Sequence, residues 1–300
     1  MEQVSPLPVR PWLLATRPHT LPAAAVPVVV GATAAVAEGA TFDGLVFAVT
    51  VAAALLIQAG TNYANDYSDF HRGADHAGRL GPVRVTQSGL LAPHAVRRGI
   101  IAAFGLATVL GLYLAWVGGW PIIAIGIASI TFGLAYTGGP WPFGYHGLGD
   151  VFVFVFFGIV AVTGTAYLQA GHWTMFALAA SVPVGLLVTN ILVVNNLRDL
   201  PTDRDAGKRT LAVRIGDAAT RAQYTVFTAA AYIISALLAV PGGRRLWLLL
   251  PWASLPLALH LVKRVQQGVS GRELNPLLEQ SGKLLLAFGA LLSAGLLLAR

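Results

Sequence analysis

The 300-residue sequence contains no cysteine and few charged residues. Without cysteine, the chain can form neither a disulfide framework nor a thiolate metal site. Only 11% of its residues are charged, whereas a typical soluble domain has about 25%. So few charges cannot cover the surface of a water-soluble chain of this length. The N-terminal segment 1–11 is polar and lacks a basic start followed by an apolar core, so we expect no cleavable signal peptide.

Hydrophobic residues make up 56% of the chain, and they gather in long continuous runs. Because the runs do not alternate with polar residues, they favour membrane helices over a β-barrel. A spanning helix needs about 20 mostly apolar residues. We count nine candidate spans, at 18–37, 44–65, 95–117, 119–137, 148–169, 174–194, 222–240, 245–262 and 282–299. The sequence therefore predicts an all-α integral membrane protein, in which residues 1–300 form one domain with about nine transmembrane helices in a single bundle.

Basic residues are distributed unevenly between the two sides of this predicted bundle. The N-terminal tail and the even-numbered connections should share one side, and they hold 17 of the 20 basic residues. By the positive-inside rule this side is cytoplasmic, which predicts a multi-pass protein of the cytoplasmic (inner) membrane. The net charge of +7 is then a topology signal, so we expect the lipid bilayer as a partner and no nucleic acid. No pattern indicates an obligate protein partner.

Two of the connections on this side are long and polar, at about 66–94 and 195–221, and we expect them to form a cap over the bundle. The first begins with an Asn- and Asp-rich cluster, 62–69. Asn62 and Asp66 are four residues apart, as are Asn65 and Asp69. On a helix, this spacing places oxygen atoms on neighbouring positions of one face.

A second acidic cluster, 195–205, begins the other polar connection. Asn195, Asp199 and Asp203 follow one another at intervals of four residues, which again places them on one helix face. Pro201 lies inside this cluster and is expected to bend or end the helix there.

Carboxylate and amide oxygens are the ligands that Mg²⁺ prefers, and Mg²⁺ completes its shell with water and substrate phosphate oxygens. Acidic groups so close together repel one another unless a cation lies between them. A solvated helix end would explain one such cluster equally well. Two clusters with Asn partners on the same predicted side favour a Mg²⁺-bound diphosphate, with active-site chemistry on the cytoplasmic face.

Basic side chains accompany both clusters. Lys208 and Arg209 follow the second cluster within a Gly-Lys-Arg-Thr run, and Arg84 lies in the first polar connection. Cations beside Mg²⁺ carboxylates would bind phosphate oxygens and stabilise a departing diphosphate; the alternative for each is ordinary loop charge. Tyr136, at the cytoplasmic end of the fourth span, is either part of the site or an interfacial aromatic.

These motifs resemble the UbiA superfamily of membrane-embedded aromatic prenyltransferases. Asn65-Asp66-x-x-Asp69 looks like the first aspartate-rich motif of that family, and Asp199-x-x-x-Asp203 with the run at 207–210 looks like the second. A narrower resemblance, to the members that prenylate 1,4-dihydroxy-2-naphthoate in the menaquinone pathway, covers residues 17–23, 62–69, 81–84, 195–216 and 274–276. Asp75 follows Asp69 at a longer spacing than the third aspartate of the wider superfamily.

The resemblance implies a UbiA-like fold and a site for a polyprenyl diphosphate and an aromatic acid. The implied catalytic residues are Asp66, Asp69, Asp199 and Asp203. The implied Mg²⁺ ligands are Asn65, Asp66, Asp69, Asn195, Asp199 and Asp203, and the implied diphosphate-binding residues are Asn62, Arg84, Tyr136, Asn196, Lys208 and Arg209. Departure of the diphosphate would give an allylic cation shielded from water by apolar spans. Attack by the dihydroxynaphthoate ring with loss of CO₂ would lead to demethylmenaquinone.

Other functions stay open at the level of sequence. A family member could use another acceptor, such as 4-hydroxybenzoate. A secondary transporter would use intramembrane acids to relay ions near the bilayer midplane, whereas the acids here cluster at span ends. A non-catalytic lipid-binding scaffold would not explain the paired spacing of Asn and Asp in the two clusters.

Overall fold

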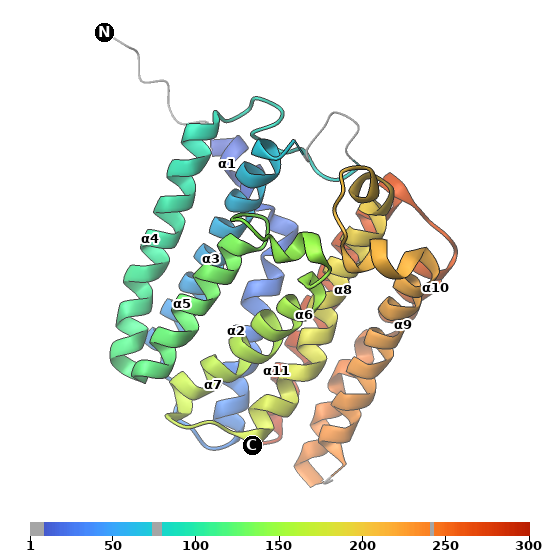
Figure 1. Cartoon of the computed structure of the whole chain (residues 1–300). Coiled ribbons are helices and arrows are strands. Elements are labelled where there is room, and N and C mark those ends of the chain that lie inside the picture. The colour runs from blue at the N-terminus through green and yellow to red at the C-terminus, as the bar shows by residue number, and fades with distance from the viewer. Residues whose placement is uncertain (1–8, 74–79, 241–242) are drawn as a thin grey trace.

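The computed structural model describes residues 9–73, 80–240 and 243–300, and this part of the chain is helical, with no strand. Figure 1 shows the helices side by side, with their connections at two opposite ends of the molecule. The α-helices are α1 (Val9–Thr16), α2 (Pro22–Ala37), α3 (Gly44–His71), α4 (Pro93–Gly118), α5 (Trp120–Ala135), α6 (Gly149–Val153), α7 (Ala161–Ala170), α8 (Met175–Asp205), α9 (Leu211–Ala239), α10 (Leu255–Gln266) and α11 (Asn275–Leu298). The 3₁₀ segments are η1 (Pro18–Thr20), η2 (Phe143–His146), η4 (Gly243–Ser254) and η5 (Gly271–Leu274), and the π-helical segment η3 (Phe154–Val160) joins α6 to α7. The predicted all-α fold is confirmed.

Each predicted span coincides with a helix, but not every helix is long enough to cross a membrane. Within the described residues, seven segments pass on length and apolar composition: α3, α4, α6 to α7, α8, α9, η4 to α10, and η5 to α11. The helices α1 and α2 form a pair bent by 53° and would make an eighth span if counted as one. The apolar helix α5 has 16 residues and is shorter. By length and apolar composition the described structure supports seven or eight spans, so the nine that we counted are not confirmed.

Both acidic clusters lie on the last turns of long helices. The helix α3 continues beyond its predicted end at residue 65 to His71, and α8 continues beyond residue 194 to Asp205. Of the two outcomes expected at Pro201, the structure excludes an end of the helix, because α8 continues to Asp205. Pro201 cannot donate a backbone hydrogen bond, but it lies about one turn from the end of α8. The Thr202 hydroxyl beside it donates to the Asp199 carbonyl at 2.9 Å.

A tight turn joins α4 to α5. The helix α4 ends at Gly118 and α5 begins at Trp120, so that Gly119 alone reverses the chain. Its φ of 75° lies in the left-handed region, which glycine adopts without the steric cost that a Cβ would add.

The helices α8 and α4 differ most in how they are packed. In the most apolar stretch of α8, 72% of the residues are buried, whereas the value for α4 is 22%. The main apolar core joins α8 to α2, α9 and α11, and Gly158 of η3 packs so closely against Gly185 of α8 that an added Cβ would lie 2.6 Å from the Gly185 Cα. Accordingly α8 lies inside the bundle, and α4 lies at its edge (Figure 1).

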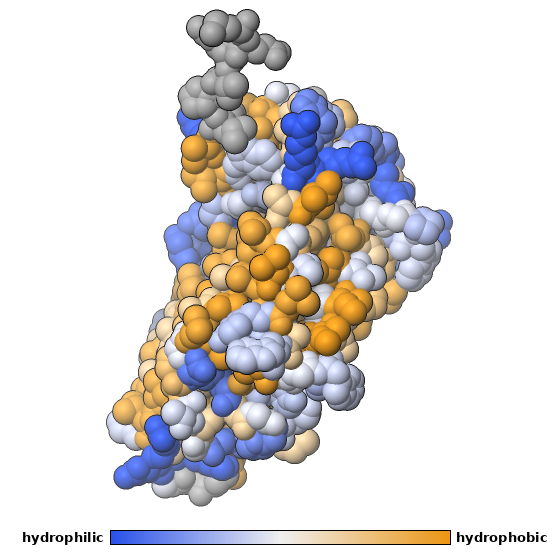
Figure 2. Space-filling view, turned by 90° about the vertical axis from the view of Figure 1, so that its left-hand side faces the viewer, coloured by the Kyte–Doolittle hydropathy of each residue, from blue (hydrophilic) through white to orange (hydrophobic). Residues whose placement is uncertain are grey.

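The outer face of the bundle is apolar across its middle. Figure 2 shows a broad band of hydrophobic side chains on the face that carries α4, with hydrophilic residues toward the two ends. On α4, Leu106, Val109 and Leu112 are all more than half exposed. Soluble monomers rarely expose a contiguous apolar surface of this extent, so the chain is a multi-pass membrane protein. Trp116 and Trp120 lie near the α4–α5 turn and are exposed, as aromatic residues at a membrane–water interface are.

The helix α1 was not expected from the sequence, which indicated a polar segment at 1–11 and a first span at 18–37. In the structure, Trp12 of α1 packs edge-on against Tyr63 of α3, with ring centroids 5.5 Å apart. The side-chain amide of Asn62 donates to the Thr16 carbonyl at 2.9 Å and to the Thr20 hydroxyl at 3.1 Å. These contacts attach α1 and η1 to the end of α3 that carries the first acidic cluster.

Candidate active site

A polar cavity of about 210 Å³ lies where the acidic ends of α3 and α8 come together. Its wall contains most of the residues that the sequence analysis singled out. Those are Asn62, Asn65, Asp69, Arg84, Tyr136, Asn195, Asn196, Asp199, Asp203 and Lys208. The two clusters, separated by more than a hundred residues of sequence, therefore face one space, as predicted for a shared site.

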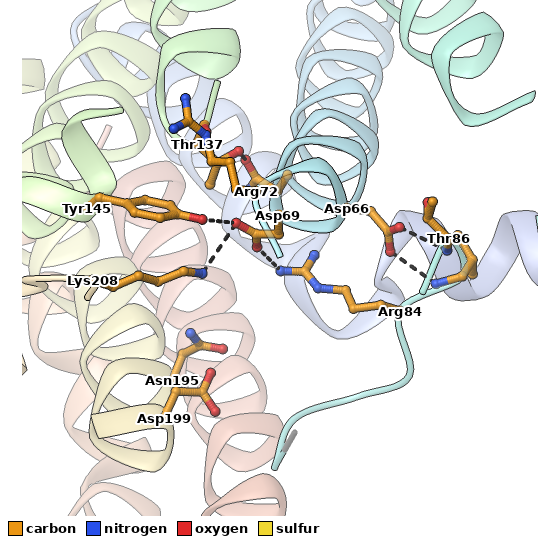
Figure 3. Close-up of polar contacts among 12 residues, drawn as sticks. Asp66, Asp69, Arg72, Arg84, Thr86, Thr137, Tyr145, Asn195, Asp199 and Lys208 are labelled. Atoms are coloured by element: carbon orange, nitrogen blue, oxygen red, sulfur yellow. Dashed lines mark hydrogen bonds and ion pairs between the residues drawn. The ribbon is translucent and has the colours of Figure 1, made fainter. Parts of the chain in front are cut away.

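Asp69 is the most highly connected carboxylate of the cavity (Figure 3). It is 2% exposed, and one oxygen, Oδ2, accepts a hydrogen bond from the Arg84 guanidinium at 2.6 Å. The other oxygen, Oδ1, accepts from the Tyr145 hydroxyl at 2.6 Å and from the Lys208 ammonium at 3.3 Å. Burial of a carboxylate is tolerated when cations and hydrogen-bond donors compensate it, and Asp69 has two cations and a hydroxyl.

Asp66, three residues earlier, has a different environment. Its two oxygens accept hydrogen bonds from the backbone N–H groups of Val85 and Thr86, at 3.1 and 3.0 Å. It is 3% exposed and is not part of the cavity wall. Asp66 thus holds the connection between α3 and α4 in place, and its predicted role as a metal ligand stays a prediction.

That connection positions Arg84 through a compact turn. The Ser88 hydroxyl and backbone N–H both donate to the Arg84 carbonyl, at 2.7 and 3.0 Å. The Leu91 N–H donates to the Val85 carbonyl at 3.1 Å. Asp66 accepts hydrogen bonds from the backbone N–H groups of Val85 and Thr86 in this turn. Together these contacts place the Arg84 side chain against Asp69.

The amides of the first cluster have separate roles. The side-chain oxygen of Asn65 accepts from the Thr137 hydroxyl at 2.8 Å, and both residues line the cavity. Asn62 also lines the cavity, while its amide nitrogen is engaged with α1 and η1. Its predicted contact with a diphosphate stays a prediction. Asp75, and Arg79 in the same segment, lie outside the described residues.

In the second cluster, Asp199 is paired with its own neighbour in sequence. The Arg198 guanidinium donates from Nε and one terminal nitrogen to the two Asp199 oxygens, at 2.8 and 2.6 Å. The same terminal nitrogen donates to the Asn195 side-chain oxygen at 2.8 Å. Asn196 and Asp203 line the cavity beside them. The cluster thus presents a pre-oriented carboxylate, and Arg198 was not among the predicted site residues.

Lys208 and Arg209 point to different places, although they are adjacent. Lys208 lines the cavity, contacts Asp69, and lies 4.6 Å from the centroid of the Tyr145 ring. Arg209 is exposed and is not part of the cavity wall; only its backbone N–H contacts the site region, donating to the Tyr145 carbonyl at 2.9 Å. Of these two predicted diphosphate contacts, Lys208 faces the polar cavity and Arg209 does not.

Tyr145 was missed in the sequence analysis, and it comes from η2. The turn that carries it folds tightly over Tyr136: the Gly144 N–H donates to the Tyr136 carbonyl at 3.0 Å. A Cβ on Gly144 would lie 2.7 Å from that carbonyl oxygen, so only glycine allows the approach. No spacing in the sequence links residue 145 to Asp69, and only the fold brings them together.

A second cavity, apolar and about 440 Å³ in volume, lies beside the polar one. Its wall is formed by α3, α4, α5, η3 and α7, with residues such as Ile57, Leu112 and Ile130. The two cavities share wall residues, namely Gln58, Thr61, Tyr136, Val153 and Phe157. Tyr136 therefore lies in the wall of both cavities, and its role in the site stays a prediction.

The donor set of the polar cavity fits Mg²⁺. Oxygens of Asn65, Asp69, Asn195, Asp199 and Asp203 line one space, and Mg²⁺ is usually held by one or two carboxylates together with substrate phosphates. Among the described residues, no three acids or histidines lie close enough to hold a metal by themselves. Water and substrate phosphate oxygens would complete the shell of an ion held there.

In this membrane-embedded bundle, a cavity lined by acids and cations adjoins an apolar cavity. This arrangement is typical of a protein that binds an amphiphilic ligand with an anionic head and an apolar tail. The sequence profile described as "UbiA prenyltransferase family" matches residues 24–274. The chain therefore belongs to the UbiA prenyltransferase family.

Known relatives align with nearly the whole chain. It is 44% identical over 289 residues to a 1,4-dihydroxy-2-naphthoate octaprenyltransferase of Mycobacterium tuberculosis, covering 95% of this chain and 96% of the relative. It is 35% identical over 288 residues to the Escherichia coli protein of the same name, covering 94% and 92%. The solved structure of a UbiA homolog from Archaeoglobus fulgidus bound to DMAPP and Mg²⁺ superimposes with a TM-score of 0.65 at 14% identity, covering 94% of this chain and 99% of that one, which supports the fold.

Proposed function

We propose that this protein transfers a polyprenyl group from a polyprenyl diphosphate to 1,4-dihydroxy-2-naphthoate, with release of diphosphate and CO₂, in menaquinone biosynthesis. The observation that carries the proposal is the cavity in which Asp69, Arg84 and Lys208 face Asp199, directly beside a larger apolar cavity. The relatives named as octaprenyltransferases for this acceptor, each aligned over more than nine-tenths of both chains, support the choice of acceptor.

The two cavities suit the two parts of the prenyl donor. The diphosphate lies in the polar cavity, where Lys208 and Arg84 can bind its oxygens, and the tail lies among the apolar side chains of α3, α4 and α5. The bond that breaks then lies at the shared wall, close to Tyr136 and Phe157. An aromatic ring face at this position stabilises a developing positive charge.

Asn65, Asp69, Asn195, Asp199 and Asp203 are the residues that would hold Mg²⁺. Bound there, the ion supplies positive charge that neutralises the diphosphate. Lys208 and Arg84 add charge-assisted hydrogen bonds to the leaving oxygens, which strengthen as negative charge develops on them. The Tyr145 hydroxyl keeps Asp69 oriented while the two cations shift toward the substrate.

The bond changes follow from the two substrates. The allylic C–O bond breaks, and its electron pair leaves with the diphosphate. The apolar walls keep water from the allylic cation, so that the electron-rich ring is the available nucleophile. A new C–C bond forms at the ring carbon bearing the carboxylate, and that group leaves as CO₂, returning its electron pair to the ring.

We also propose that the site faces the cytoplasm under a cap of polar connections. Support comes from the 17 basic residues on the predicted cytoplasmic side. The connections that follow α3 and α8 lie at the same end as the start of the described chain, and the C-terminus lies at the other end (Figure 1). Ends on opposite sides fit an odd number of crossings, which α5 and the bent α1–α2 pair would complete to nine.

The test is an assay of the purified protein with Mg²⁺, a radiolabelled polyprenyl diphosphate and a panel of aromatic acceptors. We expect labelled product and released CO₂ with 1,4-dihydroxy-2-naphthoate, loss of product when EDTA removes the metal, and recovery when Mg²⁺ is returned. Product formed only with 4-hydroxybenzoate would exclude the proposed acceptor. No product with any acceptor would exclude prenyl transfer altogether.

A further inference from the structure

Arg198 is the most deeply buried charged side chain of the site region, at 1% exposure. Four hydrogen bonds leave its guanidinium: two to the Asp199 carboxylate, one to Asn195 and one to the Asn275 side-chain oxygen at 3.0 Å. A guanidinium has five N–H donors, so nearly all of them are used by the protein itself. Arg198 also lies outside the cavity wall, and so it is not placed to bind a diphosphate.

Asn275, at the start of α11, extends this network to the first polar connection. Its amide nitrogen donates to the Leu80 carbonyl at 3.0 Å. The next residue, Gly81, packs against the guanidinium, where an added Cβ would lie 2.6 Å from one terminal nitrogen and 2.9 Å from the central carbon. Three residues later the chain reaches Arg84, which contacts Asp69.

Arg198 leaves Asp199 available to a metal. A carboxylate has about four lone-pair positions, and the two-pronged contact with Arg198 uses one on each oxygen. Asp199 remains 8% exposed and lines the cavity, so the other positions can face a ligand there. Carboxylates that bind metals are commonly oriented in this way by a second hydrogen-bonding partner.

We infer that Arg198 is a positioning residue of the metal–diphosphate site: it orients Asp199 toward the cavity and, through Asn275 and Gly81, couples that carboxylate to the connection carrying Arg84. The inference rests on the proposed function, because it gives Asp199 a metal to bind. It assigns to three residues outside the cavity wall a role in metal affinity rather than in substrate contact.

The experiment measures Mn²⁺ binding to the purified protein by electron paramagnetic resonance, in the presence of inorganic diphosphate and without acceptor. Arg198→Lys cannot make the two-pronged contact, Asn275→Ala removes the anchor, and Gly81→Ala pushes a methyl group against the guanidinium. We expect Mn²⁺ affinity to fall about 10- to 100-fold in Arg198→Lys, and in the same direction, by less, in the other two.

A matched control is Arg221→Lys. Arg221 is also a buried arginine, 6% exposed, which pairs with Asp217 at 2.6 and 2.8 Å and donates to the Val269 carbonyl at 3.0 Å, but none of these residues lines the polar cavity. The temperature of thermal unfolding should fall in both arginine variants, whereas the affinity for Mn²⁺ should fall only in Arg198→Lys.

The outcomes separate the inference from the proposed function. Wild-type affinity in Arg198→Lys and in both partner variants would overturn the inference, whatever happens to their thermal stability. An equal loss of affinity in Arg221→Lys would also overturn it, by showing a general effect of destabilisation. Absence of Mn²⁺ binding in the wild-type protein would count against the proposed metal–diphosphate site itself.

Discussion

The two acidic clusters look alike in sequence, yet their carboxylates are compensated in different ways. Asp69 is held by Arg84, Tyr145 and Lys208, which lie 15, 76 and 139 residues away along the chain. Asp199 is held by the adjacent Arg198 on the same helix. The first site exists only once three distant segments have come together, whereas the second carries its orienting partner with it.

The difference also concerns which cations can respond to a substrate. Arg84 and Lys208 line the cavity, so they can turn from Asp69 to an incoming diphosphate. Arg198 lies behind the wall, and its donors are taken up by protein oxygens. We therefore propose that the two cations on Asp69 stabilise the leaving group and that Arg198 orients the carboxylate of Asp199.

The largest effect is expected from Asp69→Ala and Asp199→Ala, which remove one carboxylate from each cluster. Turnover in the radiolabel assay should fall by about 10³-fold or more, because each variant loses a carboxylate that would hold the Mg²⁺ neutralising the diphosphate. The exposed Asp205, at the end of α8, provides the control: Asp205→Ala should keep wild-type turnover. All variants should elute as folded protein in detergent. Full activity in either cluster variant would contradict the metal site.

The sequence predicted the helices and the chemistry of the clusters because both depend on local patterns. Runs of about 20 apolar residues locate spans, and spacings of three and four place Asn65 and Asp69 on one helix face. It could not show that Asp66 turns away to hold the Val85 and Thr86 amides, because that contact depends on how the α3–α4 connection folds back.

The missed residues have the same explanation. Tyr145 and Asn275 belong to segments with no acidic motif of their own, and only long-range packing brings them to the site. Arg198 lies within the second acidic cluster, but the sequence analysis counted it only among the basic residues of the cytoplasmic side, because burial cannot be seen in one sequence. The count of nine spans is not confirmed for a local reason: α5 is only 16 residues long, and the chain bends by 53° between the segment at 9–20 and α2.

An intermediate effect is expected at Lys208, which comes from the second polar connection but contacts the carboxylate of the first cluster. Lys208→Met removes a cation from the cavity and should lower kcat about 10²-fold, as loss of one group that stabilises developing negative charge does. Arg209→Met should change kcat little, since that side chain is exposed. Steady-state kinetics with varied prenyl diphosphate tests the pair. Equal losses in the two variants would mean that general loop charge, and not the contact with Asp69, matters.

The smallest effect is expected at Tyr145. Tyr145→Phe removes the 2.6 Å hydrogen bond to Asp69, but Arg84 and Lys208 still compensate the carboxylate, and the ring that lies 4.6 Å from the Lys208 ammonium is retained. A hydrogen bond to a charged group contributes about 1.5 kcal/mol at the low end, so kcat should fall about tenfold, with the acceptor KM unchanged. Tyr167→Phe is the matched control, because its hydroxyl donates to the Gly118 carbonyl at 3.0 Å, away from the polar cavity. If Tyr145→Phe lowered kcat as much as Asp69→Ala, the hydroxyl would have to act on the substrate itself. Tyr145 would then be a third group beside Asp69, after Arg84 and Lys208, that responds to the diphosphate.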